Sequence, residues 1–155
     1  MRGREQNQQR QANGCAVAMV AACPCGDRRP ISTICFMLTG IHIQRESDIG
    51  PGLVVHNCSC LFILATRIDH SCTVNQGVSV ASVRGTGWPT IGNNVYLGAE
   101  CKVMGGVQVG DNVVVAANSL VITDVPSNCT VMGVPARIIS RQPVSPYLKS
   151  PVMTT

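Results

Sequence analysis

The sequence of 155 residues is poor in aromatic side chains, which make up 3% of it, and in charged side chains, which make up 13%. It therefore has too few rings for the stacking platforms that bind single-stranded nucleic acid. Five of the twelve basic residues precede residue 30, so the body of the chain has no basic face. This excludes nucleic acid and a membrane surface as expected partners. No apolar run approaches the roughly 18 residues that a membrane helix needs.

Cys-x-x-Cys pairs, which a zinc ribbon requires, are absent among the nine cysteines. Two Cys-x-Cys pairs occur, Cys23-Pro24-Cys25 and Cys58-Ser59-Cys60, but neither has further ligands at zinc-site spacing. An odd number of thiols fits free cysteines packed as small hydrophobes in a reducing compartment. We therefore expect a cytoplasmic protein without a bound metal.

An aliphatic residue recurs every six positions from residue 43 onward, and this repeat decides the fold. The first block slips once, after Leu61, and the second begins after a break at residues 81–90. The repeat positions are Ile43, Ile49, Val55, Leu61, Ile68, Val74 and Val80, then Ile91, Leu97, Val103, Val109, Val115 and Val121.

A period of six fits neither a helix nor separate hairpins. It predicts one short strand and one corner per unit, with three units in each triangular coil and the coils stacked as in other solenoids. Glycine often follows the aliphatic residue, as at Gly50, Gly92, Gly98 and Gly110, where we expect a tight turn or a positive φ. Residues 81–90 would form a loop outside the coils, where function is commonly found.

Residues 91–139, and above all the closing Gly133-Val134-Pro135-Ala136-Arg137, resemble the left-handed β-helix hexapeptide-repeat acyltransferases. Within that family the chain is most similar to the serine O-acetyltransferase branch and to relatives that acetylate sugars. The resemblance begins at Gly40 and implies an all-β, single-stranded left-handed parallel β-helix over residues 40–139. Residues 1–39 would form a disordered or short helical leader, and residues 140–155 a tail.

The resemblance also implies a homotrimer that uses acetyl-CoA as co-substrate, bound in a groove between neighbouring prisms. The matching cofactor positions are Ala99 and Ala117, where small side chains admit the pantetheine arm, and the segment with Gly133, Pro135 and Arg137. The guanidinium of Arg137 could approach the phosphates. Trp88, in the loop, would cap the cofactor or pack the loop.

Three catalytic positions of the family are altered in this chain. Where the serine acetyltransferase pattern has an essential His after Gly-x-Gly, an Asp one coil earlier and a loop His before Pro, this sequence has Asn57, His42 and Trp88. His56 stands one residue before the expected base. Either His56 is the base, oriented by His42 or Asn57, or it is structural, or the role falls to His42 or His70.

The predicted activity is acetyl transfer from acetyl-CoA to the hydroxyl of serine, a sugar or another small molecule, as one step of cysteine biosynthesis if the acceptor is serine. One alternative is an inactive hexapeptide-repeat protein that keeps the trimer and the cofactor groove. Another is a γ-class carbonic anhydrase, which needs three zinc-binding histidines, whereas this chain has only His42, His56 and His70.

Overall fold

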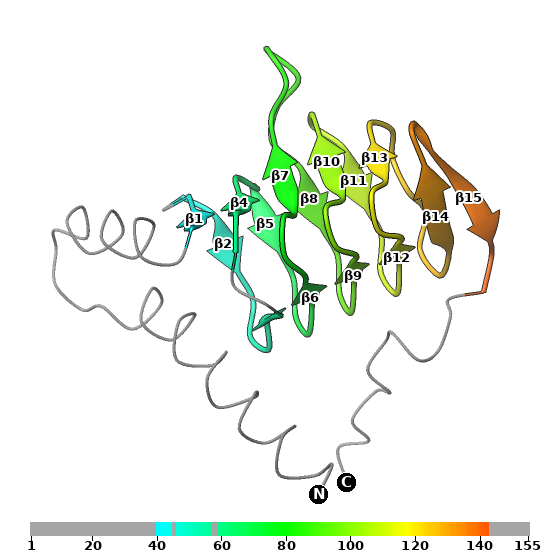
Figure 1. Cartoon of the computed structure of the whole chain (residues 1–155), viewed down its shortest axis with the longest axis horizontal. Helices are drawn as coiled ribbons and strands as arrows, with labels where there is room; N and C mark the ends of the chain where they lie inside the picture. Colours follow the sequence, from blue (N-terminus) through cyan, green and yellow to red (C-terminus); the bar gives the residue numbers. More distant parts are fainter. Residues whose placement is uncertain (1–39, 45, 57–58, 143–155) are drawn as a thin grey trace, which may run out of the picture.

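The computed structural model describes residues 40–44, 46–56 and 59–142 (Figure 1). The expected leader, residues 1–39, the expected tail from residue 143 on and the candidate Asn57 lie outside the described residues. In the part of the chain that the structure describes, no helix has the length and apolar character needed to span a bilayer.

The described strands form three sheets, which we name A, B and C. Sheet A consists of β1 (Ile41–Ile43), β4 (Leu61–Ile63), β7 (Ser79–Ala81), β10 (Lys102–Met104) and β13 (Leu120–Val121). Sheet B consists of β2 (Asp48–Ile49), β5 (Arg67–Ile68), β8 (Thr90–Ile91) and β11 (Gln108–Val109). Sheet C consists of β3 (Val54–Val55), β6 (Thr73–Val74), β9 (Tyr96–Leu97), β12 (Val114–Val115), β14 (Thr130–Gly133) and β15 (Ala136–Ser140).

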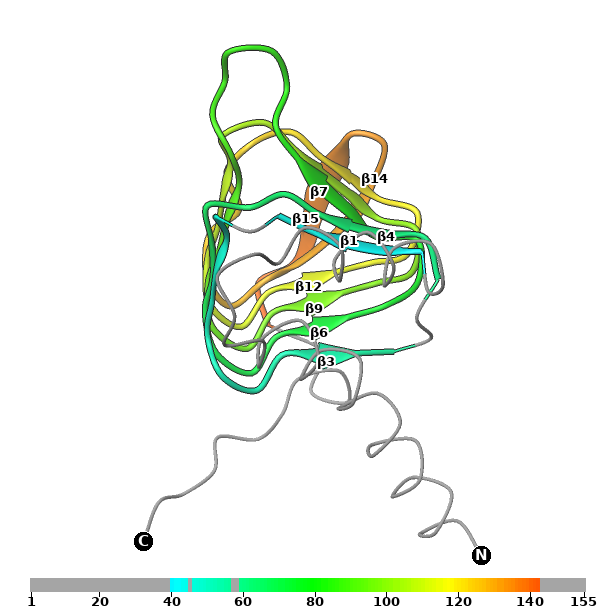
Figure 2. The same cartoon turned by 90° about the vertical axis from the view of Figure 1, so that its left-hand side faces the viewer.

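Each coil takes one strand from each sheet in turn, except that the last coil has only an isolated bridge at Val125 in place of a sheet B strand. Every pair within a sheet is parallel except β14 with β15. The view along the stack shows the sheets as three sides of a closed prism (Figure 2). We name its corners by the sheets that they join: edge AB, edge BC and edge CA. The predicted stacked-coil, all-β fold is confirmed.

One inward aliphatic column per sheet fills the prism. Strand register aligns the columns, and most of their side chains are almost fully buried. The sheet A column is Ile43, Ile63, Val80, Val103 and Val121; that of sheet B is Ile49, Ile68, Ile91, Val109 and Val125; that of sheet C is Val55, Val74, Leu97, Val115 and Val131.

The register corrects one repeat position. Ile63, not Leu61, pairs with Ile43 and Val80 in the column, so the prediction at Leu61 is wrong. The irregularity is a longer connection from Val55 to Ile63, at edge CA, which is followed by a shorter step to Ile68. Both Leu61 and Ile63 are fully buried because they alternate with exposed Phe62 on a three-residue strand. The hydrophobic pattern alone could not choose between them.

The glycines after the repeat positions allow neighbouring coils to approach each other closely; they do not supply a positive φ. Gly50, Gly92, Gly98 and Gly110 are absent from the positive-φ residues, so that part of the expectation is wrong. A Cβ on Gly98 would lie 2.6 Å from the Ala117 amide nitrogen, and one on Gly50 would lie 2.9 Å from the Asp69 carbonyl carbon. Neighbouring coils are therefore too close at these corners for any side chain.

Residues other than glycine with a left-handed backbone conformation, that is, with positive φ, stack at edges BC and CA. At edge BC, Asn94, Asn112 and Asn128 have φ of 53°, 54° and 60°. Their amides form a ladder: Asn94 Nδ2 donates to Asn112 Oδ1 at 3.0 Å, and Asn112 Nδ2 donates to Asn128 Oδ1 at 2.9 Å. Asparagine suits this corner because it tolerates the left-handed region and its side chain can pair along the stack.

We expect Asn112→Ala to destabilise the prism by about 2–4 kcal/mol, because it breaks two amide hydrogen bonds. In addition, alanine has no side-chain hydrogen bond that offsets the cost of the left-handed backbone conformation. Asn112→Gly should cost only about 1–2 kcal/mol because glycine retains the backbone conformation. Urea denaturation followed by circular dichroism measures both. Equal losses for the two variants would show that the backbone conformation contributes nothing.

Candidate functional site

At edge CA, where the chain leaves sheet C, the later coils carry small residues. The residues directly after the buried column are His56, Asn75, Gly98, Ala116 and Met132, one from each coil. Their amides bond to the coil above, as from His56 to the Val74 carbonyl at 2.8 Å. His56 is therefore on the same edge as the glycine and alanine positions, although at the first coil.

Ala99 and Ala117 form the next column on this edge. The Asn118 amide donates to the Ala99 carbonyl at 2.9 Å, and the Glu100 amide donates to the Gln76 carbonyl at 2.9 Å. Ala117 is exposed and Ala99 is half-buried, so both can face a bound molecule. Because Gly98 has no Cβ, the two coils lie in direct contact below them. Backbone and the methyl groups of Ala99 and Ala117 thus form a strip on this edge, which we name the alanine strip.

A hairpin closes this edge at the last coil. β14 and β15 pair antiparallel, with Gly133 opposite Ala136 and Arg137 opposite Met132, and a Val134-Pro135 turn that contains a cis peptide bond. Gly133 has φ of 108°, and its amide is bonded to the Ser119 hydroxyl at 3.2 Å. Val134, Pro135 and Arg137 are exposed, so the segment predicted to bind cofactor lies open at the end of the strip.

The three histidines lie on different parts of the prism. His42 is exposed on β1 of sheet A, where its ring centroid lies 5.8 Å from that of Phe62. His56 is exposed at edge CA, and His70 is exposed at edge BC, after β5. Among the described residues no group of three His, Cys, Asp or Glu side chains could hold a metal ion.

Trp88 lies on a different edge from the alanine strip. It belongs to residues 82–89, which connect β7 of sheet A to β8 of sheet B and project from the prism (Figures 1 and 2). Its side chain is 41% exposed. Within one chain, sheet A separates Trp88 from Ala99 and Ala117, so a single prism does not bring all the predicted cofactor residues together.

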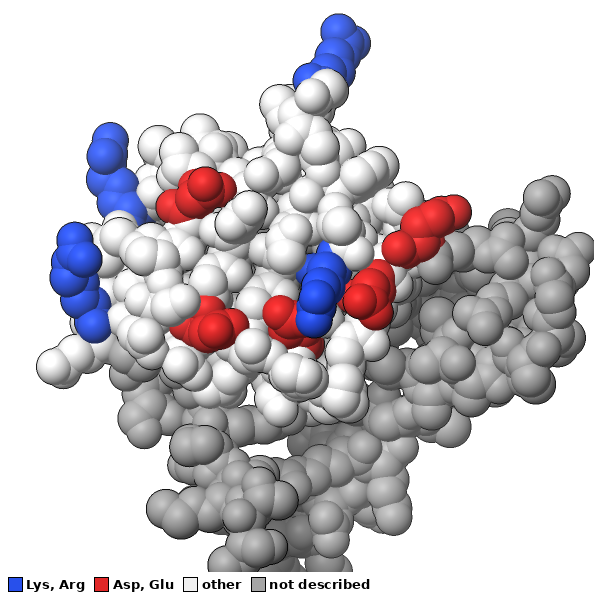
Figure 3. Space-filling model, turned by 180° about the vertical axis from the view of Figure 1, so that it is seen from behind, with Lys and Arg blue, Asp and Glu red and all other residues white. Residues whose placement is uncertain are grey.

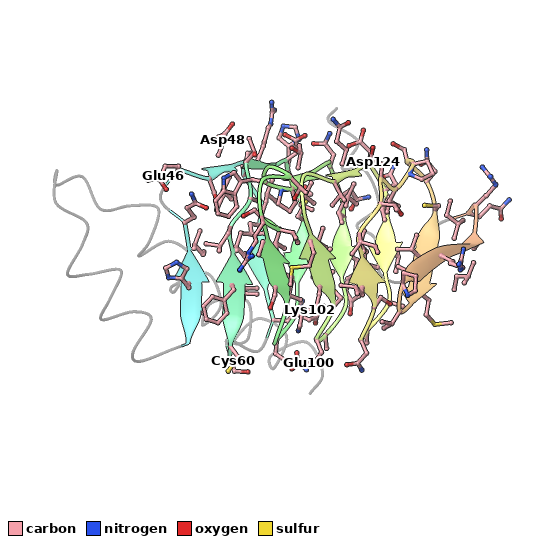
Figure 4. All side chains as sticks on the ribbon, turned by 90° about the horizontal axis from the view of Figure 1, so that it is seen from above. Glu46, Asp48, Cys60, Glu100, Lys102 and Asp124 are labelled. Atoms are coloured by element: carbon pink, nitrogen blue, oxygen red, sulfur yellow. The ribbon has the colours of Figure 1, made fainter. Side chains whose placement is uncertain are left out.

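The outer surface of sheet A, between those two edges, is mostly apolar. Phe62 and Ile122 are 40% and 50% exposed, and Leu64, Met104 and Leu120 are half-buried. Lys102, on β10, is a charged residue of this sheet. Asp48 and Asp124 are seen on the opposite side from Cys60 and Glu100 (Figure 4). In the view from behind, one basic side chain lies in the middle of the face, directly beside acidic ones, and the other basic side chains lie at the rim (Figure 3).

Lys102 ties edge CA together next to the alanine strip. Its Nζ donates to the Gly77 carbonyl at 2.8 Å and to the Glu100 carbonyl at 3.1 Å, and lies 3.6 Å from Glu100 Oε2. Glu100 has φ of 60°, which a glutamate seldom adopts. Glu100 and Lys102 were not singled out from the sequence. Only the structure reveals that Lys102 reaches the Gly77 carbonyl of the neighbouring coil.

Residues 89–123 match the family model described as bacterial transferase hexapeptide (six repeats). A serine acetyltransferase of Helicobacter pylori is 34% identical over 117 residues, which cover 73% of this chain and 68% of that protein. The chain belongs to the serine acetyltransferase family. The predicted resemblance to this branch of the hexapeptide-repeat acyltransferases is therefore confirmed, and with it the left-handed β-helix.

Other serine acetyltransferases are similar to the same part of the chain. The enzyme of Synechococcus elongatus is 38% identical over 120 residues, 75% of this chain and 49% of that protein. A crystal structure of the Brucella abortus enzyme has 30% identity and a TM-score of 0.69, over 73% of this chain and 47% of that one. The structure of its complex with coenzyme A has 28% identity, a TM-score of 0.68 and coverage of 72% and 46%. The chain thus spans about half the length of several relatives.

The thiol of Cys101 lies inside edge CA, and burial raises its pKa from 9.0 to about 12, while nearby Lys102 opposes the shift. The unfolded chain therefore releases this proton above pH 9, whereas the folded chain retains it until about pH 12. We expect the thiol's contribution to stability to be full below pH 9 and to be lost as the pH rises toward 12.

Denaturant midpoints across this pH range test the expectation. Cys101→Ala removes the titrating group, so its stability should fall less steeply with pH than that of the wild type, even though the variant starts lower because of the small cavity. If the denaturant midpoints of the two proteins fall equally with pH, the pH dependence comes from groups other than Cys101.

Proposed function

We propose that this protein transfers the acetyl group of acetyl-CoA to a hydroxyl acceptor, with serine as the first candidate. Membership of the serine acetyltransferase family, in which one solved relative is a complex with coenzyme A, is the observation that carries the proposal. The chain's own support is edge CA, where the small residues Ala99 and Ala117 lie between the hairpin of the last coil and the coils that lead to His56.

Acetyl-CoA would lie along this strip. Its pantetheine arm would pass Ala99 and Ala117, whose methyl groups leave room for it, and the nucleotide end would meet Gly133, Pro135 and Arg137 at the hairpin. Arg137 is exposed and offers a guanidinium for phosphate oxygens. This path leaves the thioester near the first coils, on the side of His56.

Acetyl transfer in this arrangement is direct. A base takes the proton of the acceptor hydroxyl, the oxygen attacks the thioester carbon, and the carbon–sulfur bond breaks to release CoA, whose sulfur is protonated. We assign the base to His56, oriented by His42 or Asn57. His56 supports this role by being exposed on edge CA, whereas His70 is at edge BC.

A homotrimer is part of the proposal. Trp88 and the alanine strip lie on two edges of one prism, so a second subunit must bring its loop to the strip if both contact one cofactor. The apolar outer surface of sheet A, with Phe62 and Ile122 exposed, gives neighbouring prisms a surface to bury. A cytoplasmic location is supported by the four free thiols among the described residues.

A second candidate is a cofactor-binding trimer without catalysis. The observation that favours it is the altered set of positions, since Asn57, His42 and Trp88 stand where the family pattern has its essential His, its Asp and its loop His. Tryptophan can donate a hydrogen bond but cannot accept the acceptor's proton. Such a protein would be stabilised by acetyl-CoA without consuming it.

Ala117→Leu should weaken acetyl-CoA binding about tenfold or more, equivalent to about 1.4 kcal/mol, because the larger side chain occupies the strip. Ala117 is exposed, so the fold should tolerate the change. Isothermal titration calorimetry measures the affinity. Gln108→Leu, an exposed change on sheet B, is the matched control and should bind as the wild type does. Equal binding by both variants would remove the strip from the cofactor site.

Mass spectrometry should detect loss of acetyl-CoA that depends on L-serine, with O-acetylserine formed in equal amount. His56→Ala should then lower kcat by about a hundredfold or more, as expected for loss of a general base. His70→Ala, on edge BC, should leave kcat unchanged. Turnover with a sugar but not with serine would show that the acceptor is a sugar and not serine. Binding without turnover for both acceptors would establish the non-catalytic alternative.

A further inference from the structure

The loop of residues 82–89 begins with a tight turn of its own. The Thr86 amide and the Thr86 hydroxyl both donate to the Val83 carbonyl, at 2.9 Å and 2.6 Å. Gly85, between them, has φ of 73°, as the third position of a type II turn requires. The turn fixes the shape of the tip, but these bonds do not attach it to the prism.

The coil below holds the end of the loop. The Thr66 amide donates to the Pro89 carbonyl at 2.9 Å, and the Thr66 hydroxyl lies 3.4 Å from the Trp88 carbonyl. Pro89 is buried, whereas the Trp88 side chain next to it is largely exposed. These contacts fix the backbone of Trp88 on one side only.

The coil above supplies the other contact, through a glycine. A Cβ on Gly106 would overlap the Thr86 carbonyl oxygen, would lie 3.1 Å from its carbon and would lie 3.5 Å from Gly87 Cα. The approach is between backbones, so no side chain could rotate to make room. Gly106 therefore admits the loop against the coil.

The corner that contains Gly106 is held more firmly than the loop. The Gly105 amide donates to the Ala81 carbonyl at 2.9 Å, and Val107 is 7% exposed in the core. β10, directly before, pairs with strands on both sides. In the loop, Val83 and Trp88 are 48% and 41% exposed. A side chain at position 106 would therefore displace the loop and not the corner.

We infer that Gly106 is a positioning residue, which holds the loop so that Trp88 is presented to the cofactor groove of a neighbouring subunit in the proposed trimer. The inference rests on the proposed function for its catalytic consequence, but not for its structural one. It assigns a role to Gly106, which the six-residue aliphatic repeat does not explain.

Trp88 is the single tryptophan of the chain, so its fluorescence reports on the loop alone. In Gly106→Ala, acrylamide quenching of Trp88 should rise and its emission should shift to longer wavelength. The KM for acetyl-CoA should increase about tenfold with kcat within about twofold, since Trp88 contributes to binding and not to proton transfer.

Gly110→Ala is the matched control. Its added Cβ would lie 2.6 Å from the Ser127 amide nitrogen, a comparable crowding at edge BC, away from the loop. It should lower the melting temperature and leave Trp88 quenching and the KM for acetyl-CoA at their wild-type values.

Wild-type quenching in Gly106→Ala would overturn the inference, as would an equal rise in the Gly110→Ala control. If Gly106→Ala does not fold, the wild type decides: acrylamide should quench Trp88 clearly less than it quenches free N-acetyltryptophanamide, and equal quenching would show that the loop is not held against the coil and would overturn the inference. If the wild type transfers no acetyl group, the proposed function fails, while the quenching comparison still decides the role of Gly106.

Discussion

The parallel ladder between coils is the constraint on which the rest of this structure depends. Each coil must place its aliphatic residues directly above those of the coil before it, because the prism has no other core. The interior has room for valine, leucine and isoleucine but hardly for rings, which accounts for the scarcity of aromatic residues. Corner residues follow from the same constraint, since coils in register bring their corners into contact and favour glycine or left-handed asparagine at several of them.

Most of the fold could be predicted from the six-residue period, and the exceptions have one physical origin. Periodicity identifies residues that face inward but does not reveal their partners in the neighbouring coil. Leu61 and Ile63 both face inward, so only the strand pairing shows which belongs to the column. Likewise, the sequence marks Gly98 as a corner residue, whereas its reason, the Ala117 amide against it, belongs to another coil.

The candidate site depends on the same information between coils. Ala99, Ala117 and the hairpin could be predicted through their resemblance to the serine acetyltransferases, and the structure places them along one edge with His56. That Trp88 lies across sheet A from them could not be read from spacing alone, because an edge is assigned only when the strands are. A repeat protein thus builds its surface sites from residues about one coil apart in sequence, and its loops can reach only certain edges.

The antiparallel strand β15 also changes the exposed face of the last coil. A solenoid whose last coil was open would offer three rows of unpaired backbone groups, on which a second molecule could stack and extend the ladder into a fibre. β15 covers sheet C with a strand of opposite direction, and its pairing with β14 contains a register shift. Another chain that stacked there could not continue the six-residue period on all three sides. The hairpin that opens toward the proposed cofactor strip therefore also protects the protein against polymerisation from this end.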